Sequence, residues 1–254
     1  MAKTSETIDV LKITQDRVTY AVRGRTPLLL NRMSEKAKNQ LLFPKGKKTA
    51  ADKVNSLKHN PVQEFRDSPY RLREDDAPTL VAHLATAFKQ AIAATAIDIP
   101  GATKAQISRL LWVEGEKLPI YGIPKLHMSV TRSADMNKTP DIRTRCILPE
   151  WATYVTVTFS TPILREAVVS SLFAAAGMIQ GVGDWRNQKG SGTFGQFELV
   201  DAEDADFKRI VETGGRQAQI DAMEAAESYD LETEELFDWF ITEAEKRGVK
   251  EVLR

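Results

Sequence analysis

The residues with the clearest chemical potential lie in a glycine-rich segment, 181–195, which holds five glycines in fifteen positions. Glycine lets the backbone approach a ligand closely, and successive backbone N–H groups can cradle a phosphate. Trp185, Arg186, Lys189 and Ser191 are interleaved with the glycines, and they supply positive charge and a flat ring on which a base can stack. This pattern predicts a loop that contacts nucleic acid. The alternative is a long turn between a helix and a strand, with Trp185 filling the core.

The usual nucleotide-binding motifs do not account for this segment. The chain contains no G-x-x-x-x-G-K-[ST] motif, and Gly190-Ser191-Gly192 precedes a predicted strand instead of joining a strand to a helix. A phosphate-binding loop or a dinucleotide-binding fold requires that strand–loop–helix context. Both are therefore excluded.

Basic side chains elsewhere extend the nucleic-acid hypothesis. Arg143 and Arg145 share one face of a predicted strand, and three lysines cluster in a loop after the first strand. Such residues could track the phosphates of a single strand, although the alternative is an ordinary solvated surface. The complete set of predicted nucleic-acid-binding residues is Lys45, Lys47, Lys48, Lys89, Arg132, Arg143, Arg145, Trp185, Arg186, Lys189 and Ser191.

Catalytic and metal-binding chemistry has little support. The only histidines are His59, His83 and His127, and the only cysteine is Cys146, so no metal-ligand spacing exists. His83, on the polar face of a predicted helix, is a general base only in principle. We therefore expect no catalytic residue, no metal and no cofactor.

Composition places the chain among cytoplasmic proteins. A single cysteine forms no internal disulfide, the first residues are polar, and no apolar run reaches the length of a membrane span.

The net charge of zero hides an asymmetry. Residues 201–254 hold 16 acidic and 7 basic side chains, and residues 1–200 hold 19 acidic and 28 basic ones. A basic body with an acidic tail is common in proteins that meet polyanions, although a solvated acidic helix pair would look the same.

The elements that must position these residues follow from hydrophobic periodicity. Alternation predicts strands at 17–23, 142–146 and 155–159, and a closing strand at 197–199. A spacing of four predicts a helix from Leu80 to Ile97, and a second helix opens on Thr161 and Pro162 and ends near Gly177. Two acidic helices, over about 203–228 and 231–247, follow. The order strand, helix, strands, helix, strand has a split β-α-β character.

The segment from Gly181-Val182-Gly183 to Gly190-Ser191-Gly192-Thr193-Phe194-Gly195, between a helix and a final strand, resembles the glycine-rich signature of the RAMP superfamily. Those are ferredoxin-like RNA-binding proteins of CRISPR effector complexes. The helix 80–97, with Phe88-Lys89 inside it, is similar to their first core helix, and residues 110–159 are similar to the protruding thumb of their backbone subunits. The stretch from Thr26 to Ala37 also resembles a family of tailed-phage proteins, so the resemblance covers roughly residues 20–200.

These observations predict an α+β fold with a modified ferredoxin-like, RNA-recognition-motif-like core, a strand-rich thumb insertion and C-terminal helices. The core would occupy residues 1–200, with a basic insertion at 32–78 and the thumb at about 110–150, and residues 201–254 would form an acidic helical appendage. The expected function is binding of single-stranded RNA or DNA through its backbone by several copies side by side, in the cytoplasm of a bacterial host. Partners would be nucleic acid, other copies of the chain and phage recombination or CRISPR proteins, and no membrane.

Three other functions stay open. One is a metal-independent endoribonuclease, which would need His83 or His127 beside the glycine-rich segment. Another is a protein-interaction module that mimics or blocks a subunit of a CRISPR complex. The third is an accessory of phage recombination or strand annealing.

Overall fold

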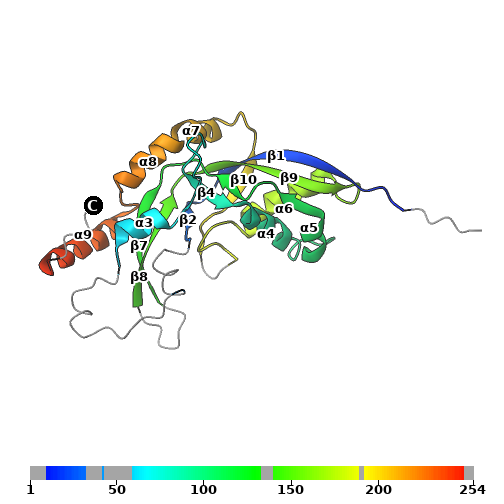
Figure 1. Cartoon of the computed structure of the whole chain (residues 1–254). Coiled ribbons are helices and arrows are strands. Elements are labelled where there is room, and N and C mark those ends of the chain that lie inside the picture. Colours follow the sequence, from blue (N-terminus) through cyan, green and yellow to red (C-terminus); the bar gives the residue numbers. More distant parts are fainter. Residues whose placement is uncertain (1–9, 33–41, 43–58, 133–139, 189–191, 249–254) are drawn as a thin grey trace, which may run out of the picture.

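The computed structural model describes residues 10–32, 42, 59–132, 140–188 and 192–248, and shows an α+β protein (Figure 1). Its longest strands are β1 (Thr14–Gly24) and β9 (Ala152–Thr161), which pair antiparallel from Thr14–Thr161 to Arg23–Ala152. β10 (Phe197–Val200) pairs with the other edge of β1, and β5 (Leu111–Val113) pairs with β9. The sheet order is therefore β10-β1-β9-β5, and every pairing is antiparallel.

Two helices, α4 (Ala85–Thr95) and α6 (Glu166–Ile179), cover one face of this sheet (Figure 1). Their apolar side chains join alternate residues of the strands in one core cluster, in which Phe88, Phe173 and Phe197 make tilted or edge-to-face ring contacts. Side chains along β1 and β9 alternate between the two faces of the sheet, so the strand residues of this cluster lie on the face that the helices cover.

Gly177 does not end α6, as the sequence predicts, but lies inside the helix. A Cβ at this position would collide with the backbone carbonyl oxygen of Phe197. The glycine is thus required by the close approach of α6 to β10 and not by a helix cap.

Two further predicted boundaries are wrong, and strand pairing explains both. Residues 81–84 form β4 (Val81–Leu84), a strand that pairs with β3 (Tyr70–Arg71) and β6 (Lys117–Pro119), so the helix starts only at Ala85. The helix predicted to open at Thr161 begins at Glu166, because Thr161 still pairs with Thr14 at the end of β9. Tertiary pairing overrides helical spacing at these ends.

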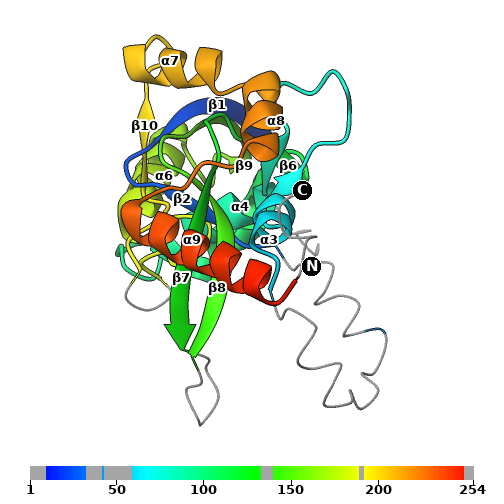
Figure 2. The ribbon, with the colours of Figure 1, turned by 90° about the vertical axis from the view of Figure 1, so that its left-hand side faces the viewer.

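A third sheet carries a long hairpin away from the core. It has the order β2-β8-β7, built from β2 (Leu28–Leu30), β7 (Lys125–Arg132) and β8 (Pro140–Leu148). The short helix α3 (Pro61–Asp67) packs against β8, and α5 (Lys104–Leu110) leads into β5. Figure 2 shows the hairpin β7–β8 projecting from the body of the protein.

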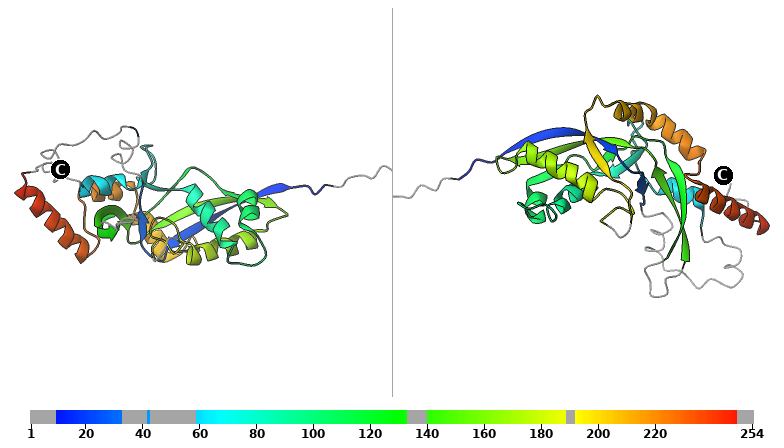
Figure 3. Two further views of the ribbon diagram at one scale, coloured as in Figure 1. Left: turned by 90° about the horizontal axis from the view of Figure 1, so that it is seen from below. Right: turned by 180° about the vertical axis from the view of Figure 1, so that it is seen from behind.

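The C-terminal helices pack on the rest of the chain. The segment predicted as one helix over 203–228 is broken at Gly214-Gly215 into α7 (Ala205–Thr213) and α8 (Arg216–Glu224). α7 covers the second face of the core sheet, where Phe207 meets Tyr154 at a ring distance of 5.0 Å. The last helix, α9 (Leu231–Lys246), crosses β7 and contributes Phe240 and Ala244 to the main core (Figure 3).

Candidate functional site

The hairpin and the glycine-rich segment meet at an arginine–tryptophan contact. Arg143 and Arg145 lie on the same face of β8, opposite Ser129 and His127 of β7. The Arg145 guanidinium carbon is 5.7 Å from the centroid of the Trp185 ring, a cation–π contact, and its Nε is 3.5 Å from Asp184. We call Arg143, Arg145 and Trp185 the hairpin face.

The two arginines differ in access to solvent. The side chain of Arg143 is 53% exposed, and its Nε forms an ion pair with Asp141 Oδ2 at 3.5 Å. Arg145 is buried, and burial lowers the pKa of its guanidinium while the charge of Asp184 opposes that effect. Arg143 is therefore the residue available to an incoming phosphate, and Arg145 holds Trp185.

Trp185 is 39% exposed and adopts a left-handed backbone with φ of 52°. Its ring stacks on Phe194 at 6.3 Å with an interplanar angle of 16°. A bulky residue at positive φ is uncommon and costs energy, so the surrounding contacts must hold it there. The ring is at the surface, but Arg145 and Phe194 already contact it.

The backbone of the glycine-rich segment is tied to the body of the protein. The N–H groups of residues 181, 182, 184, 194 and 195 all donate to backbone carbonyl oxygens, those of 184 and 195 to Leu29 and Pro27. Gly195 has a φ of 72°, and a Cβ there would collide with the Val182 carbonyl oxygen. These five N–H groups are thus not free to cradle a phosphate, which corrects that part of the sequence-based expectation.

The remaining predicted residues lie apart from the hairpin face or outside the described part of the chain. Arg186 hydrogen-bonds within the glycine-rich segment, where it donates to Gly183 O at 2.7 Å and to the Gln188 side chain. Lys89 lies on α4 and is half-buried. Arg132 is exposed at the end of β7, where strand alternation points it away from the face of Arg143. The residues outside the described ranges are Lys45, Lys47, Lys48, Lys189 and Ser191.

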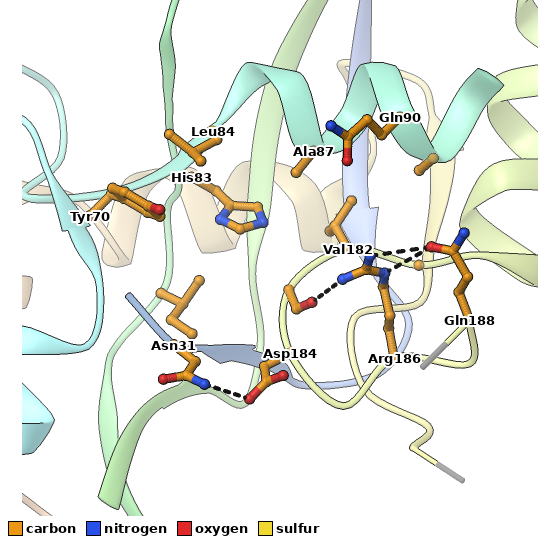
Figure 4. A pocket seen from close by; sticks show the side chains of 14 residues that line it. Asn31, Tyr70, His83, Leu84, Ala87, Gln90, Val182, Asp184, Arg186 and Gln188 are labelled. Carbon is orange, nitrogen blue, oxygen red and sulfur yellow. Dashed lines mark hydrogen bonds between the residues drawn. The ribbon is translucent and has the colours of Figure 1, made fainter. Parts of the chain in front are cut away.

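A pocket of about 350 Å³ lies between α4 and the glycine-rich segment (Figure 4). His83 lines it from β4, so it is a buried strand residue and not the exposed helix residue that the sequence predicts. Asn31, Tyr70, Gln90 and Asp184 also line the pocket. Sequence reasoning places His83 and Gln90 on one face but finds no pocket, because the other walls come from distant segments.

Burial is the main influence on the pKa values of His83 and His127. It lowers the pKa of His83 to about 4, reinforced by the positive charge of Arg186, and it also lowers the pKa of His127. The thiol of Cys146 is buried, and its pKa is raised. Both imidazoles are therefore neutral near pH 7, and Cys146 is not an activated nucleophile.

Within the described ranges, no group of three or more His, Cys, Asp or Glu side chains is arranged to hold a metal ion. No helix in that part of the chain is long and apolar enough to cross a membrane. No protein-family model matches the sequence, and no curated protein matches it either.

Proposed function

We propose that this protein binds single-stranded nucleic acid along the hairpin face, mainly through the strand's phosphates. The contact of Arg145 with Trp185, beside the exposed Arg143, is the observation that carries the proposal. Single-strand binders combine positive charge that follows the backbone with aromatic rings on which bases stack. The hairpin face offers the exposed charge of Arg143 beside the part of the Trp185 ring that Arg145 and Phe194 leave at the surface. The 28 basic against 19 acidic residues in 1–200 add to the attraction.

The fold supports the proposal through its strand order. The core sheet has the order β10-β1-β9-β5, with α4 between β1 and β5 along the chain and α6 between β9 and β10. Two such split β-α-β units on one antiparallel sheet are the arrangement of a ferredoxin-like fold. In this proposal the core is ferredoxin-like, the hairpin β7–β8 is the thumb, and the chain is related to the RAMP superfamily.

The proposal also includes assembly of several copies along one strand, in the cytoplasm of a bacterial host. Modest binding sites commonly gain affinity through cooperativity. The net charge of −9 in residues 201–254 and of +9 in residues 1–200 favours head-to-tail contacts between copies.

Reversing the charge of Arg143 tests the hairpin face. Arg143→Glu is expected to weaken binding of a single-stranded oligonucleotide roughly ten-fold at low salt, and to reduce the slope of log affinity against log salt by about 1. Fluorescence anisotropy at several salt concentrations measures both quantities. Lys104→Glu, an exposed cation on α5 with the same change in net charge, is the matched control. If the two variants bind equally, the strand does not run over the hairpin face.

Metal-independent RNA cleavage is the second candidate function, and one observation favours it. His83 lines the same pocket as Gly181 and Gly183, and the His127 ring lies 6.2 Å from that of Phe194, so both histidines are beside the glycine-rich segment. A neutral imidazole can take up the proton of an attacking 2′-hydroxyl.

The test is incubation of the protein with RNA in the presence of a chelator. Our proposal of a non-enzymatic binder predicts intact RNA. Cleavage that His83→Ala abolishes would establish the second function instead.

A further inference from the structure

The pocket between α4 and the glycine-rich segment is separate from the hairpin face but shares Asp184 with it. Figure 4 shows the His83 ring pointing into the pocket between α4 and the backbone of the segment. A volume of about 350 Å³ lies within the range of small-ligand sites. The polar side chains of its walls include those of His83, Asn31, Tyr70, Gln90, Asp184 and Arg186.

His83 is the strongest sign of a ligand. The residue is only 9% exposed, and neither ring nitrogen has a hydrogen-bond partner among the described residues. The rings of Tyr70, at 6.5 Å, and Phe88, at 6.1 Å, fix the imidazole from its sides. Buried polar groups nearly always have partners, so an unpartnered imidazole that faces a pocket indicates that a ligand supplies them.

The imidazole also restricts what that ligand offers. A neutral imidazole has one N–H donor and one acceptor nitrogen. Because the two nitrogens point in different directions around the ring, one edge of a planar ligand meets only one of them. The ligand is therefore expected to pair with His83 through a single donor or a single acceptor.

The charges around the pocket balance and are already engaged. Asp184 accepts from Asn31 Nδ2 at 2.9 Å and pairs with Arg145, and Arg186 donates to Gly183 O and Gln188. One carboxylate and one guanidinium leave no net charge at the walls. This balance favours a neutral polar ligand and disfavours an anion.

We infer that the pocket binds a nucleobase, with one ring nitrogen of His83 hydrogen-bonded to its edge. Nucleobases present adjacent donors and acceptors on one planar edge, and side-chain amides such as those of Asn31 and Gln90 are suited to pair with them. The inference deepens the proposed function, because a base that leaves the stack of a bound strand would enter here. A free nucleoside carries the same edge, so the test separates these two sources.

The experiment compares wild type with His83→Phe, which keeps an aromatic ring but removes both nitrogens. The probes are the four ribonucleosides, measured by calorimetry, and an oligonucleotide in normal and fully abasic form, measured by anisotropy. Loss of the hydrogen bond to His83 is expected to weaken nucleoside binding roughly ten-fold in His83→Phe. Tyr121→Phe, which removes one polar group from a half-buried ring outside the pocket, is the control for the nucleoside measurements and is expected to bind like wild type.

For the strand, wild type is expected to bind the normal oligonucleotide more tightly than the abasic one. His83→Phe is expected to reduce that difference and to leave only the part that stacking on Trp185 supplies. If wild type shows this preference but binds no free nucleoside, the ligand of the pocket is a base of the bound strand. Nucleoside binding that depends on His83, with no oligonucleotide binding, would support the pocket and contradict the proposed function. Equal binding of both oligonucleotides without nucleoside binding, or a preference that His83→Phe retains in full, would overturn the inference and leave strand binding intact.

Discussion

Replacing Gln219 by leucine is expected to lower the free energy of unfolding by about 3–6 kcal/mol. This side chain is fully buried in α8, where its Oε1 accepts from the N–H groups of Leu80 at 2.9 Å and Val81 at 2.8 Å. Its Nε2 donates to the carbonyl oxygens of Ile120, Gly122 and Gly214 at 2.8–3.0 Å. Leucine has a similar size but makes none of these hydrogen bonds. The N–H groups of Leu80 and Val81 then lose their acceptor, at a cost of about 1–3 kcal/mol each. The carbonyl oxygens cost less, since that of Gly214 keeps its hydrogen bond from the Gly122 N–H.

Urea denaturation measures this effect, and Gln217→Leu is the matched control in the same helix. Gln217 is exposed, and its amide donates only to Asp221, so its replacement is expected to change stability by no more than about 0.5 kcal/mol. A Gln219→Leu protein within about 1 kcal/mol of wild type would contradict this account of how α8 is joined to residues 80–122.

The stability of the protein is expected to fall as the pH drops from about 6.5 to about 4, and His83 is expected to account for about 3 kcal/mol of that loss. In the folded chain, burial and the charge of Arg186 lower its pKa to about 4, whereas the unfolded imidazole titrates near 6.5. Between these values the unfolded state binds more protons, so acid favours unfolding. Above pH 6.5 both states are neutral, and the full stability is present.

Urea denaturation at pH 7 and pH 4.5 tests this linkage in wild type and in His83→Phe. Phenylalanine does not titrate, so the variant is expected to lose less stability than wild type over this interval. Superimposable pH profiles for the two proteins would show that His83 is not buried in the neutral form.

Elements with one buried face are the ones that the sequence predicts well. Strands at 17–23, 142–146 and 155–159 are confirmed as parts of β1, β8 and β9, and the helix predicted at 231–247 is confirmed as α9. Along β1 and β9, alternating side chains meet different environments, and the local sequence pattern reflects that difference. In β8, Thr144, Arg145 and Cys146 are all buried, so only the sequence alternates there. The mixed α+β class follows from these elements.

Boundaries set by distant partners are not predictable in this way. The apolar residues Leu80, Leu84 and Phe88 have helical spacing, yet Val81–Leu84 is a strand because β3 and β6 lie on either side of it. The candidate site is hard to predict from the sequence for the same reason. Alternation places Arg143 and Arg145 on one face, but the contact of Arg145 with Trp185 joins segments 40 residues apart in the sequence.

The central claim is that the chain binds a single strand through its phosphates, and salt-dependent binding tests it most directly. The measurement is the affinity and stoichiometry of the full chain on single-stranded oligonucleotides of increasing length, at several salt concentrations. The account predicts that log affinity falls linearly with log salt, by about 0.7 for each phosphate contact, and that more copies bind as the strand lengthens. Absent binding, or an affinity that salt does not change, would contradict it.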